Sequence, residues 1–287
     1  MRALIAGSGG QLGRALQASV PDAAVVIAPA EADFDITRAD VVARVVAEVK
    51  PDVIFNAAAY TAVDKAESDA ELAHLINATA VGHLAQAAHT NGARLVHVST
   101  DFIFDGTSSK AYQPDDAACP LGVYGQTKWD GECAARVDPN ALIVRTAWVY
   151  APTGNNFVRT MLRVMAERPE VKVVVDQIGT PTYAPGLAQT LWALASKNCI
   201  GTYHYTDSGV ASWYDFAVAI QEEALSLGLL NGAVPIIPIS TSDYPTPAAR
   251  PAFSVLDKSK TWAALGGPAP HWRTQLRIML ESIKRHG

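Results

Sequence analysis

The sequence predicts an α/β protein built on a doubly wound parallel sheet, and three observations lead to this fold class. Short apolar runs alternate with helical patterns over the first half of the chain, as in sheets whose parallel strands are joined by helices. A glycine-rich turn at residues 7–13 directly follows the first apolar run. The polar residues best suited to chemistry stand where such runs end, and sheets of this class bind ligands at the carboxyl ends of their strands.

Length and composition are those of an ordinary globular protein and exclude several classes of function. The chain has 287 residues, of which 49% are hydrophobic and 18% charged, so a large core is expected. A net charge of -5 argues against nucleic-acid binding, and no run reaches the roughly 20 apolar residues of a membrane span. The chain opens without a signal-peptide pattern, so we expect a cytoplasmic protein. Three scattered cysteines and seven histidines without ligand spacing indicate no metal site.

The first element is the apolar run Ala3–Ala6, which predicts a buried parallel strand, with a helical pattern beginning at Arg14. Between them, Gly7, Gly10 and Gly13 form a G-x-x-G-x-x-G turn. Glycines at these positions allow a tight turn, a close approach of backbone to a pyrophosphate, and close packing of helix on strand. The N–H groups at the helix start then face the anion. We therefore predict a dinucleotide site at this turn.

The second strand, predicted at residues 24–28, lacks the acidic residue that usually binds the adenosine ribose of NAD at this point. Glu31 is the first acid after it, and no arginine stands nearby to bind a 2′-phosphate. The choice between NADPH and NADH therefore stays open. Asp35 either approaches the adenine or caps a helix expected from about Arg38 to Val49, and the two roles are compatible.

The third and fourth strands deliver small and hydroxylated residues to the same edge of the sheet. The third, residues 51–56, runs into Ala57–Ala59, small side chains that let a cofactor lie against the backbone. Helical patterns follow at residues 64–67 and 77–88. The fourth strand, Leu95–Thr100, ends in two hydroxyl side chains.

Tyr124 and Lys128 stand at the start of a predicted helix and lie one turn apart on the same face. A free tyrosine titrates near about 10, and a lysine ammonium beside it favours the phenolate and lowers that pKa. Together with Thr100, such a pair can exchange a proton with a carbonyl or alcohol oxygen. The Tyr-x-x-x-Lys spacing alone also occurs in ordinary amphipathic helices, so the assignment depends on the other motifs.

Beyond Tyr150 the composition changes, and residues 151–287 predict a smaller substrate-holding domain interwoven with the first. We expect residues 1–150 to form the dinucleotide-binding domain, to which some later strands and helices return. The proline-rich tail around Arg250 predicts irregular, pocket-forming structure. The other elements expected are a strand at 141–145, a helix opening at 155–157, strands at 171–175 and 201–205, a loop at 176–181 and a helix at 213–227.

The glycine turn, Ser99-Thr100-Asp101 and Tyr124-x-x-x-Lys128 together resemble the extended short-chain dehydrogenase/reductase superfamily. Within it, longer runs are similar to the dTDP-4-dehydrorhamnose reductase family and are spread over nearly the whole chain. These runs are residues 56–67, 99–106, 145–150, 154–157, 176–181 and 246–251.

The resemblance implies a Rossmann-type domain and reduction of the 4-keto group of dTDP-4-dehydro-L-rhamnose to dTDP-L-rhamnose by NADPH or NADH. Tyr124 would protonate the developing alkoxide, Lys128 would lower the tyrosine pKa and bind the nicotinamide ribose, and Thr100 would hydrogen-bond the sugar oxygen or the tyrosine. The remaining cofactor residues implied are Gly7, Gly10, Gln11, Leu12, Gly13, Asp35, Ile36, Ala59, Tyr60 and Thr61. Asp101 and Trp148 would contact the sugar, and Asn156 and Arg250 the nucleotide side.

Several of these residues also have plain structural interpretations. Arg250 could form a surface salt bridge, although a dianionic nucleotide diphosphate calls for an arginine fork. Trp148 could belong to the core. Asn77 either braces the active-site helix or lies on a helix surface. Ala15 stands where some relatives carry an acid that binds a metal between subunits, so we expect no metal bridge and at most a weak homodimer.

Other functions within the same resemblance differ at few positions. A dehydratase places a second acid after the active-site threonine and aspartate, whereas Phe102 follows Asp101 here. Another nucleotide-sugar 4-ketoreductase or a 4-epimerase would use the same tyrosine and lysine. A non-catalytic alternative is a regulatory subunit like the beta subunit of methionine adenosyltransferase, against which the intact Thr100, Tyr124 and Lys128 argue. We expect a nucleotide-sugar reductase.

Overall fold

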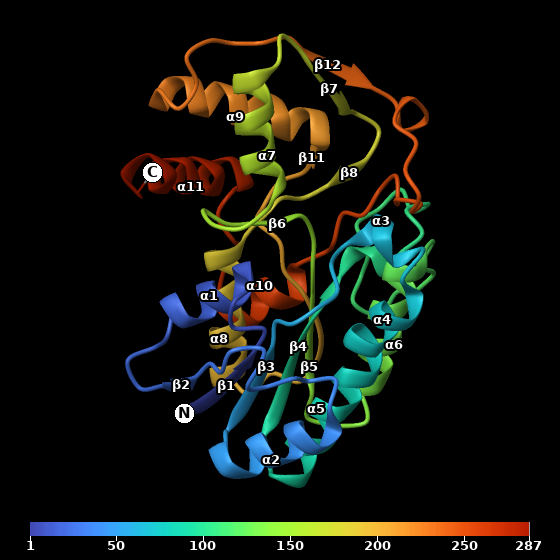
Figure 1. Ribbon diagram of the computed structural model, residues 1–287, viewed down its shortest axis with the longest axis vertical. Coiled ribbons are helices and arrows are strands. Elements are labelled where there is room, and N and C mark those ends of the chain that lie inside the picture. The colour runs from blue at the N-terminus through green and yellow to red at the C-terminus, as the bar shows by residue number, and fades with distance from the viewer. Residues whose placement is uncertain (287) are drawn as a thin grey trace.

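A six-stranded parallel sheet forms the centre of the protein, seen here in a computed structural model that describes residues 1–286 (Figure 1). The strands are β1 (Arg2–Ala6), β2 (Val25–Ile27), β3 (Val53–Asn56), β4 (Arg94–Thr100), β5 (Leu142–Thr146) and β10 (Gly201–His204). Their order across the sheet is β10-β5-β4-β3-β1-β2, and every neighbouring pair is parallel. The chain therefore reverses its direction of travel across the sheet at β1, which confirms the predicted doubly wound fold.

Helices cover both faces of this sheet (Figure 1). On one face α1 (Gln11–Ala18) packs against α8 (Ala184–Ser196), and on the other α5 (Ala80–Thr90) packs against α2 (Ala39–Val49) and α6 (Val123–Ala135). Ile5 belongs to the first of these cores and its neighbour Leu4 to the second. Because successive side chains point to opposite faces and both faces are covered, the strands are apolar throughout.

The glycine turn has the tight packing that its sequence predicts. Gly7 has φ +74°, and a Cβ there would lie 2.5 Å from the backbone nitrogen of Ala58. A Cβ on Gly13 would lie 2.1 Å from the Gly7 carbonyl oxygen. The turn therefore brings α1 and β3 closer than any side chain at these positions would allow. The helix begins at Gln11, earlier than the expected Arg14.

The segment after β3 holds two short helices, α3 (Val63–Ala66) and α4 (Ala70–His74), and a π-helical turn at Leu75–Thr79. Asn77 lies in this turn and is 1% exposed. Its amide accepts from Tyr60 N at 2.9 Å and donates to the Tyr60 carbonyl at 3.1 Å and to Thr127 Oγ1 at 3.2 Å. Of the two roles considered for Asn77, bracing of the active-site helix is the one the structure shows.

The second half forms a separate layer at one end of the sheet, at the top of Figure 1. Helices α7 (Phe157–Glu167) and α11 (Trp272–His286) pack against α9 (Trp213–Leu227), whose predicted bounds are confirmed. Ser212 and Asp215 form a capping box that fixes the start of α9. Strand β7 (Val171–Val174) pairs in parallel with β12 (Ile236–Ile239).

Two expectations for this half are wrong in part. The proline-rich tail contains β12, where Pro238 fits because a strand with only one neighbour leaves its other edge free of ladder bonds. The expected loop at residues 176–181 contains β8 (Ile178–Gly179), paired with β11 (Ala211–Ser212). Helices α8, α10 (Ser259–Leu265) and α11 were not predicted from the sequence.

Later segments return to the first half of the chain. β10 pairs with β5, α8 lies against α1, and α10 contacts β10. A further parallel pair, β6 (Val149–Tyr150) with β9 (Thr182–Tyr183), connects the sheet to the second layer. Among residues 1–286 no helix is long and apolar enough to cross a membrane.

Candidate active site

A cavity of about 720 Å³ opens where β3, β4 and β5 end, between the sheet and the second layer. The glycine turn, the small residues after β3 and the first turns of α6 form its wall on the sheet side. Trp213 and Arg250 contribute from the second half of the chain. Of the residues singled out from the sequence, those that line this cavity are Gly10, Gln11, Leu12, Ala59, Thr61, Thr100, Asp101, Tyr124, Lys128, Trp148 and Arg250.

Other predicted cofactor residues lie behind or beside this wall. Gly7 and Gly13 shape the turn from the side of β3, and Ile36 is buried in the core between α2 and α5. The Asp35 carboxylate accepts from the Thr37 N–H at 2.9 Å and its hydroxyl at 2.6 Å. Helix α2 begins after Arg38 without a side-chain cap, so the expectation that Asp35 caps it is wrong. Oδ1 of Asp35 accepts both bonds from Thr37 and so stabilises a local turn instead.

Tyr60 and Asn156 brace loops around the cavity. The Tyr60 hydroxyl donates to Asp69 Oδ2 at 3.1 Å, away from the wall. Asn156 caps α7, and its amide donates to Gln11 Oε1 at 2.9 Å. Asn156 thereby connects the second layer to the first turn of α1.

Tyr124 lies in the first turn of α6, half-buried, with its ring edge-on to Phe102. Desolvation raises the pKa of Tyr124 to about 12, a hydrogen bond with Thr100 acts to lower it, and the Asp101 charge raises it. The phenol therefore holds its proton firmly. Gly125 makes this packing tight, since a Cβ there would lie 2.3 Å from the Phe102 carbonyl oxygen.

Lys128 is 2% exposed, and its Nζ donates to the Val98 carbonyl oxygen at 2.7 Å. Desolvation lowers the pKa of Lys128 to about 8, while the Glu132 charge one turn further along acts to raise it. The pKa of Tyr124 is thus raised overall rather than lowered as expected, because desolvation outweighs whatever the neighbouring Lys128 contributes. The i to i+4 spacing places both residues at one cavity, but the ammonium bonds to the strand carbonyl rather than to the phenol.

Thr100 and Asp101 stand at the end of β4, and both are buried. The Thr100 hydroxyl donates to Asp101 Oδ1 at 3.1 Å and accepts from the Phe102 N–H at 3.2 Å. Burial raises the pKa of Asp101 to about 6, against hydrogen bonds from Ser254 and Thr100. Its Oδ2 is buried and has no hydrogen-bond partner among the described residues, and the residue itself lines the cavity.

A buried ion pair behind α6 was not expected from the sequence. Glu132 of α6 accepts from Arg145 Nε and Nη2 of β5, both at 2.9 Å, and from Arg136 at 2.9 Å. Burial alone would raise the pKa of Glu132, but the hydrogen bonds and charge of Arg145 hold it below its ordinary value. The sequence does contain one sign of this pair: Arg145 ends the otherwise apolar run that begins at Ala141, and a buried arginine needs an acidic partner.

Two tryptophans form an aromatic wall of the cavity. The rings of Trp148 and Trp213 stack with centroids 3.6 Å apart and an interplanar angle of 11°. Trp148 has φ +47°, and a Cβ on Gly179 would lie 2.8 Å from its ring. Trp148 is thus both packed and part of the cavity wall, and Trp213 is a wall residue that the sequence analysis placed only at a helix start.

Arg250 lines the main cavity and also a side cavity of about 70 Å³ next to it. It is ion-paired to Asp64 at 2.8 Å, so the salt bridge considered from the sequence exists, within the cavity wall. The described part of the chain holds no group of three or more His, Cys, Asp or Glu side chains placed for a metal ion.

Comparison with known proteins places this geometry in a family. The family described as the RmlD substrate binding domain matches residues 1–285. The chain is 44% identical to dTDP-4-dehydrorhamnose reductase of Burkholderia thailandensis over 298 aligned positions, covering 99% of both chains. The chain belongs to the dTDP-4-dehydrorhamnose reductase family.

Solved structures of this family have the same architecture. One from Clostridium acetobutylicum has a TM-score of 0.93 and 39% identity, covering 99% of this chain and 100% of that one. One from Bacillus anthracis, in complex with NADP, has a TM-score of 0.92 and 36% identity, covering 98% and 99%.

Proposed function

We propose that this protein uses NADPH or NADH to reduce the 4-keto group of dTDP-4-dehydro-L-rhamnose, giving dTDP-L-rhamnose. The observation that carries the proposal is a single cavity lined by the glycine turn and by Thr100, Tyr124 and Lys128. Family membership over the full chain supports the reaction and the substrate. The NADP complex of the Bacillus anthracis relative supports the cofactor class.

The residues around the glycine turn fit a dinucleotide. Gly9 and Gly10 line the cavity, and a Cβ on Gly9 would meet nothing within 4 Å, which leaves open space beside the backbone at the start of α1. On the facing wall, the small side chains of Ala57–Ala59 leave room for the cofactor against the backbone. A bound dihydronicotinamide supplies a hydride for the carbonyl carbon. Gly10, Gln11, Leu12, Ala59 and Thr61 are the residues that we assign to holding it, supported by Gly7, Gly13, Asp35, Ile36 and Tyr60 behind the wall.

Tyr124 is the proton donor in this proposal. Its raised pKa keeps the phenol protonated at neutral pH, so the proton is present when the carbonyl oxygen becomes an alkoxide. The Lys128 ammonium, held at the Val98 carbonyl, stabilises the phenolate that remains. Thr100 lines the same cavity as the tyrosine, and we assign it to orienting the phenol and the sugar oxygen.

The second half of the chain, residues 151–287, mostly holds the substrate in this proposal. From the first half of the chain, Asp101 and Trp148 line the cavity and are the residues that we assign to the sugar. Arg250 binds the nucleotide diphosphate in this proposal, and Asn156, which caps α7 and bonds to Gln11, supports the wall beside it. Nicotinamide cofactors and nucleotide sugars are metabolites of the cytoplasm, where we place the protein, as a monomer or weak homodimer.

The test is oxidation of NADPH and of NADH by the purified protein supplied with dTDP-4-dehydro-L-rhamnose. We expect turnover, and a loss of about 10²-fold or more in kcat for Tyr124→Phe, because the phenol proton is gone. A wild type that binds the cofactor without consuming it contradicts the proposal. Interconversion of sugar epimers without net cofactor oxidation would establish a 4-epimerase instead.

A further inference from the structure

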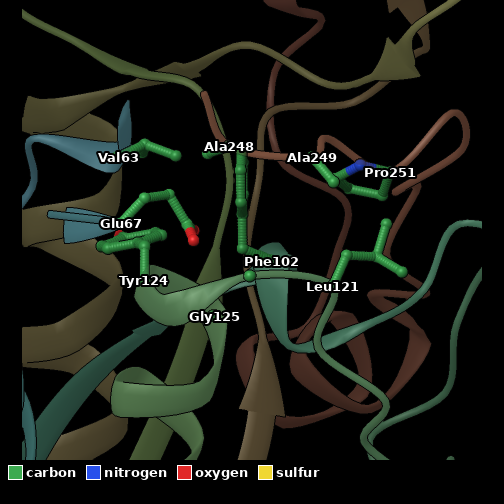
Figure 2. Close-up of a pocket in the computed structure, with 10 residues that line it drawn as sticks. Val63, Glu67, Phe102, Leu121, Tyr124, Gly125, Ala248, Ala249 and Pro251 are labelled. Carbon is green, nitrogen blue, oxygen red and sulfur yellow. The ribbon is translucent and has the colours of Figure 1, made fainter. Parts of the chain in front are cut away.

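The short helix α3 joins the substrate side of the cavity to the catalytic helix. Asp64 on α3 accepts from Arg250 Nη1 at 3.0 Å, from Arg250 Nη2 at 2.8 Å, and from the Ala248 N–H at 3.2 Å. These three bonds hold the segment of residues 246–251 against the first half of the chain. Figure 2 shows the pocket where these parts meet. Val63 and Glu67 from the α3 region, Ala248 and Pro251 from the segment 246–251, and Tyr124 of α6 line it.

The bonds to Asp64 use one edge of the Arg250 guanidinium and leave another edge free. Nη1 also donates to the Thr246 hydroxyl and to the Ala248 carbonyl, so both of its hydrogens are engaged. Nη2 uses one hydrogen on Asp64. An arginine has five N–H groups, so the Nε–H and the second Nη2–H remain, and they have no acceptor among the described residues. Those two parallel groups can bind two phosphate oxygens at once.

The backbone around Arg250 is stiff, and hydrogen bonds to Asp64, Thr246 and Ala248 hold its guanidinium in place. Pro247 and Pro251 restrict the chain before and after it. The Arg250 side chain is 23% exposed and lines the main cavity. Its anionic partner Asp64 is 42% exposed and bonds to the Nη1–Nη2 edge of the guanidinium, which is adjacent to the free pair of Nε–H and Nη2–H. Asp64 therefore leaves room for a second anion on Arg250.

One turn beyond Asp64, Glu67 contacts the catalytic helix. Its Oε1 accepts from the Val123 N–H at 2.9 Å, a free donor of the first turn of α6, next to Tyr124. A Cβ on Gly122 would lie 2.6 Å from the same oxygen, so the glycine allows the approach. A carboxylate also interacts favourably with the positive end of the helix.

We propose that α3 is a positioning element, in which Asp64 orients Arg250 for the diphosphate of the substrate while Glu67 fixes the first turn of α6 and hence Tyr124. This proposal rests on the proposed function, because it assigns residues to the same substrate. The two carboxylates act on different steps: Asp64 on binding of the nucleotide and Glu67 on the chemical step.

The first experiment separates these steps with Asp64→Asn and Glu67→Ala, using the full chain. For D64N we expect the dissociation constant of dTDP, measured by calorimetry with NADP⁺ present, to rise about tenfold and kcat to change less than about threefold. If Asp64 instead competes with the diphosphate for Arg250, D64N will bind dTDP more tightly, and the proposal is overturned.

For E67A we expect kcat to fall about tenfold while the dTDP dissociation constant stays within about twofold of the wild type. Glu67→Gln keeps an amide oxygen that can accept the Val123 N–H, so it should restore most of kcat. If the loss in E67A came from partial unfolding, E67Q would lose kcat to the same extent and would not restore it. E67A with wild-type kcat overturns this half of the proposal.

Lys65→Gln is the matched control, because Lys65 lies on the same short helix and its only ion pair among the described residues is with Asp69, at 3.4 Å on the surface. It should leave both kcat and dTDP binding unchanged. If K65Q weakens dTDP binding as much as D64N does, the effect of D64N comes from unfolding of α3, and the proposal is overturned. If the wild type does not turn over the sugar, the proposed function fails by itself. The dTDP dissociation constants of wild type, D64N and K65Q then still decide whether Asp64 orients Arg250.

Discussion

Two arginine–carboxylate pairs in this protein have similar bonds and opposite surroundings. Arg145 and Glu132 meet through two 2.9 Å bonds with side chains 1% and 0% exposed. Arg250 and Asp64 meet at 2.8 and 3.0 Å with side chains 23% and 42% exposed, at a cavity wall. Arg145 also bonds to the Pro114 carbonyl, whereas two N–H groups of Arg250 have no acceptor in the described part of the chain.

The difference shows how burial decides what an ion pair does. Charges taken out of water must be matched by their partners, so the Arg145–Glu132 pair fixes how β5 and α6 pack behind Lys128. A pair that water still reaches contributes little to folding. Arg250 can therefore give part of its hydrogen-bonding capacity to a ligand. We infer that the first pair serves structure and the second serves binding.

The largest effect expected is the loss of stability when the buried pair is broken. Glu132→Ala leaves Arg145 charged and buried, so we expect the free energy of unfolding to fall by about 3–5 kcal/mol. Urea unfolding followed by circular dichroism measures this. A double variant, Glu132→Leu with Arg145→Met, leaves only the partly exposed Arg136 without its carboxylate and no buried charge unpaired, so it should lose much less. A single variant within about 1 kcal/mol of the wild type would remove the structural role from this pair.

The next effect concerns the cavity-side arginine. Arg250→Lys keeps the charge but cannot bond to Asp64 and to a diphosphate with two separate edges. We expect dTDP binding to weaken by about 2 kcal/mol, or roughly 30-fold, as measured by calorimetry. Arg163→Lys is the control, since Arg163 forms an exposed pair with Glu167 on α7. Equal binding by R250K and the wild type would show that the fork of Arg250 does not contact the nucleotide.

A pH effect connects the buried pair to catalysis. The pKa of Lys128 in the folded protein is lowered to about 8, so its ammonium is complete below that pH and is lost above it. We expect kcat/KM to fall above about pH 8, approaching tenfold per unit, because the neutral amine no longer stabilises the phenolate. Glu132 acts to raise this pKa, so Glu132→Gln should move the fall to lower pH. A profile that is flat to pH 10 would contradict the role of Lys128.

The sequence predicted the parts of this site that local patterns determine. The glycine turn, the strands ending at Asn56 and Thr100, and the shared face of Tyr124 and Lys128 follow from periodicity and spacing of nearby residues. The direction of the Lys128 side chain does not follow from these patterns. Its Nζ could bond to the Tyr124 phenol or to a carbonyl of β4, and the packing of the folded protein selects the carbonyl.

Contacts between distant segments could not be read from the sequence. Asp64 and Arg250 are 186 positions apart, and their bonds appear only when residues 246–251 cross back over α3. The proline-rich tail indicates irregular backbone and gives no sign of β12, whose partner β7 lies far earlier in the chain. The sequence places Trp213 only at the start of a helix, and its stacking on Trp148 in the cavity wall becomes visible in the structure alone.

The smallest effect expected completes the comparison between the two pairs. Asp64→Asn removes an ion pair whose acid is 42% exposed and therefore screened by water, so we expect a loss of less than about 1 kcal/mol in the free energy of unfolding. Urea unfolding at low and at high salt measures it, and the difference should shrink as salt rises. A loss as large as that of E132A would mean that the segment of residues 246–251 needs Asp64 to fold. Weak dTDP binding by D64N would then reflect a displaced segment, and the distinction between a structural and a binding ion pair would no longer hold.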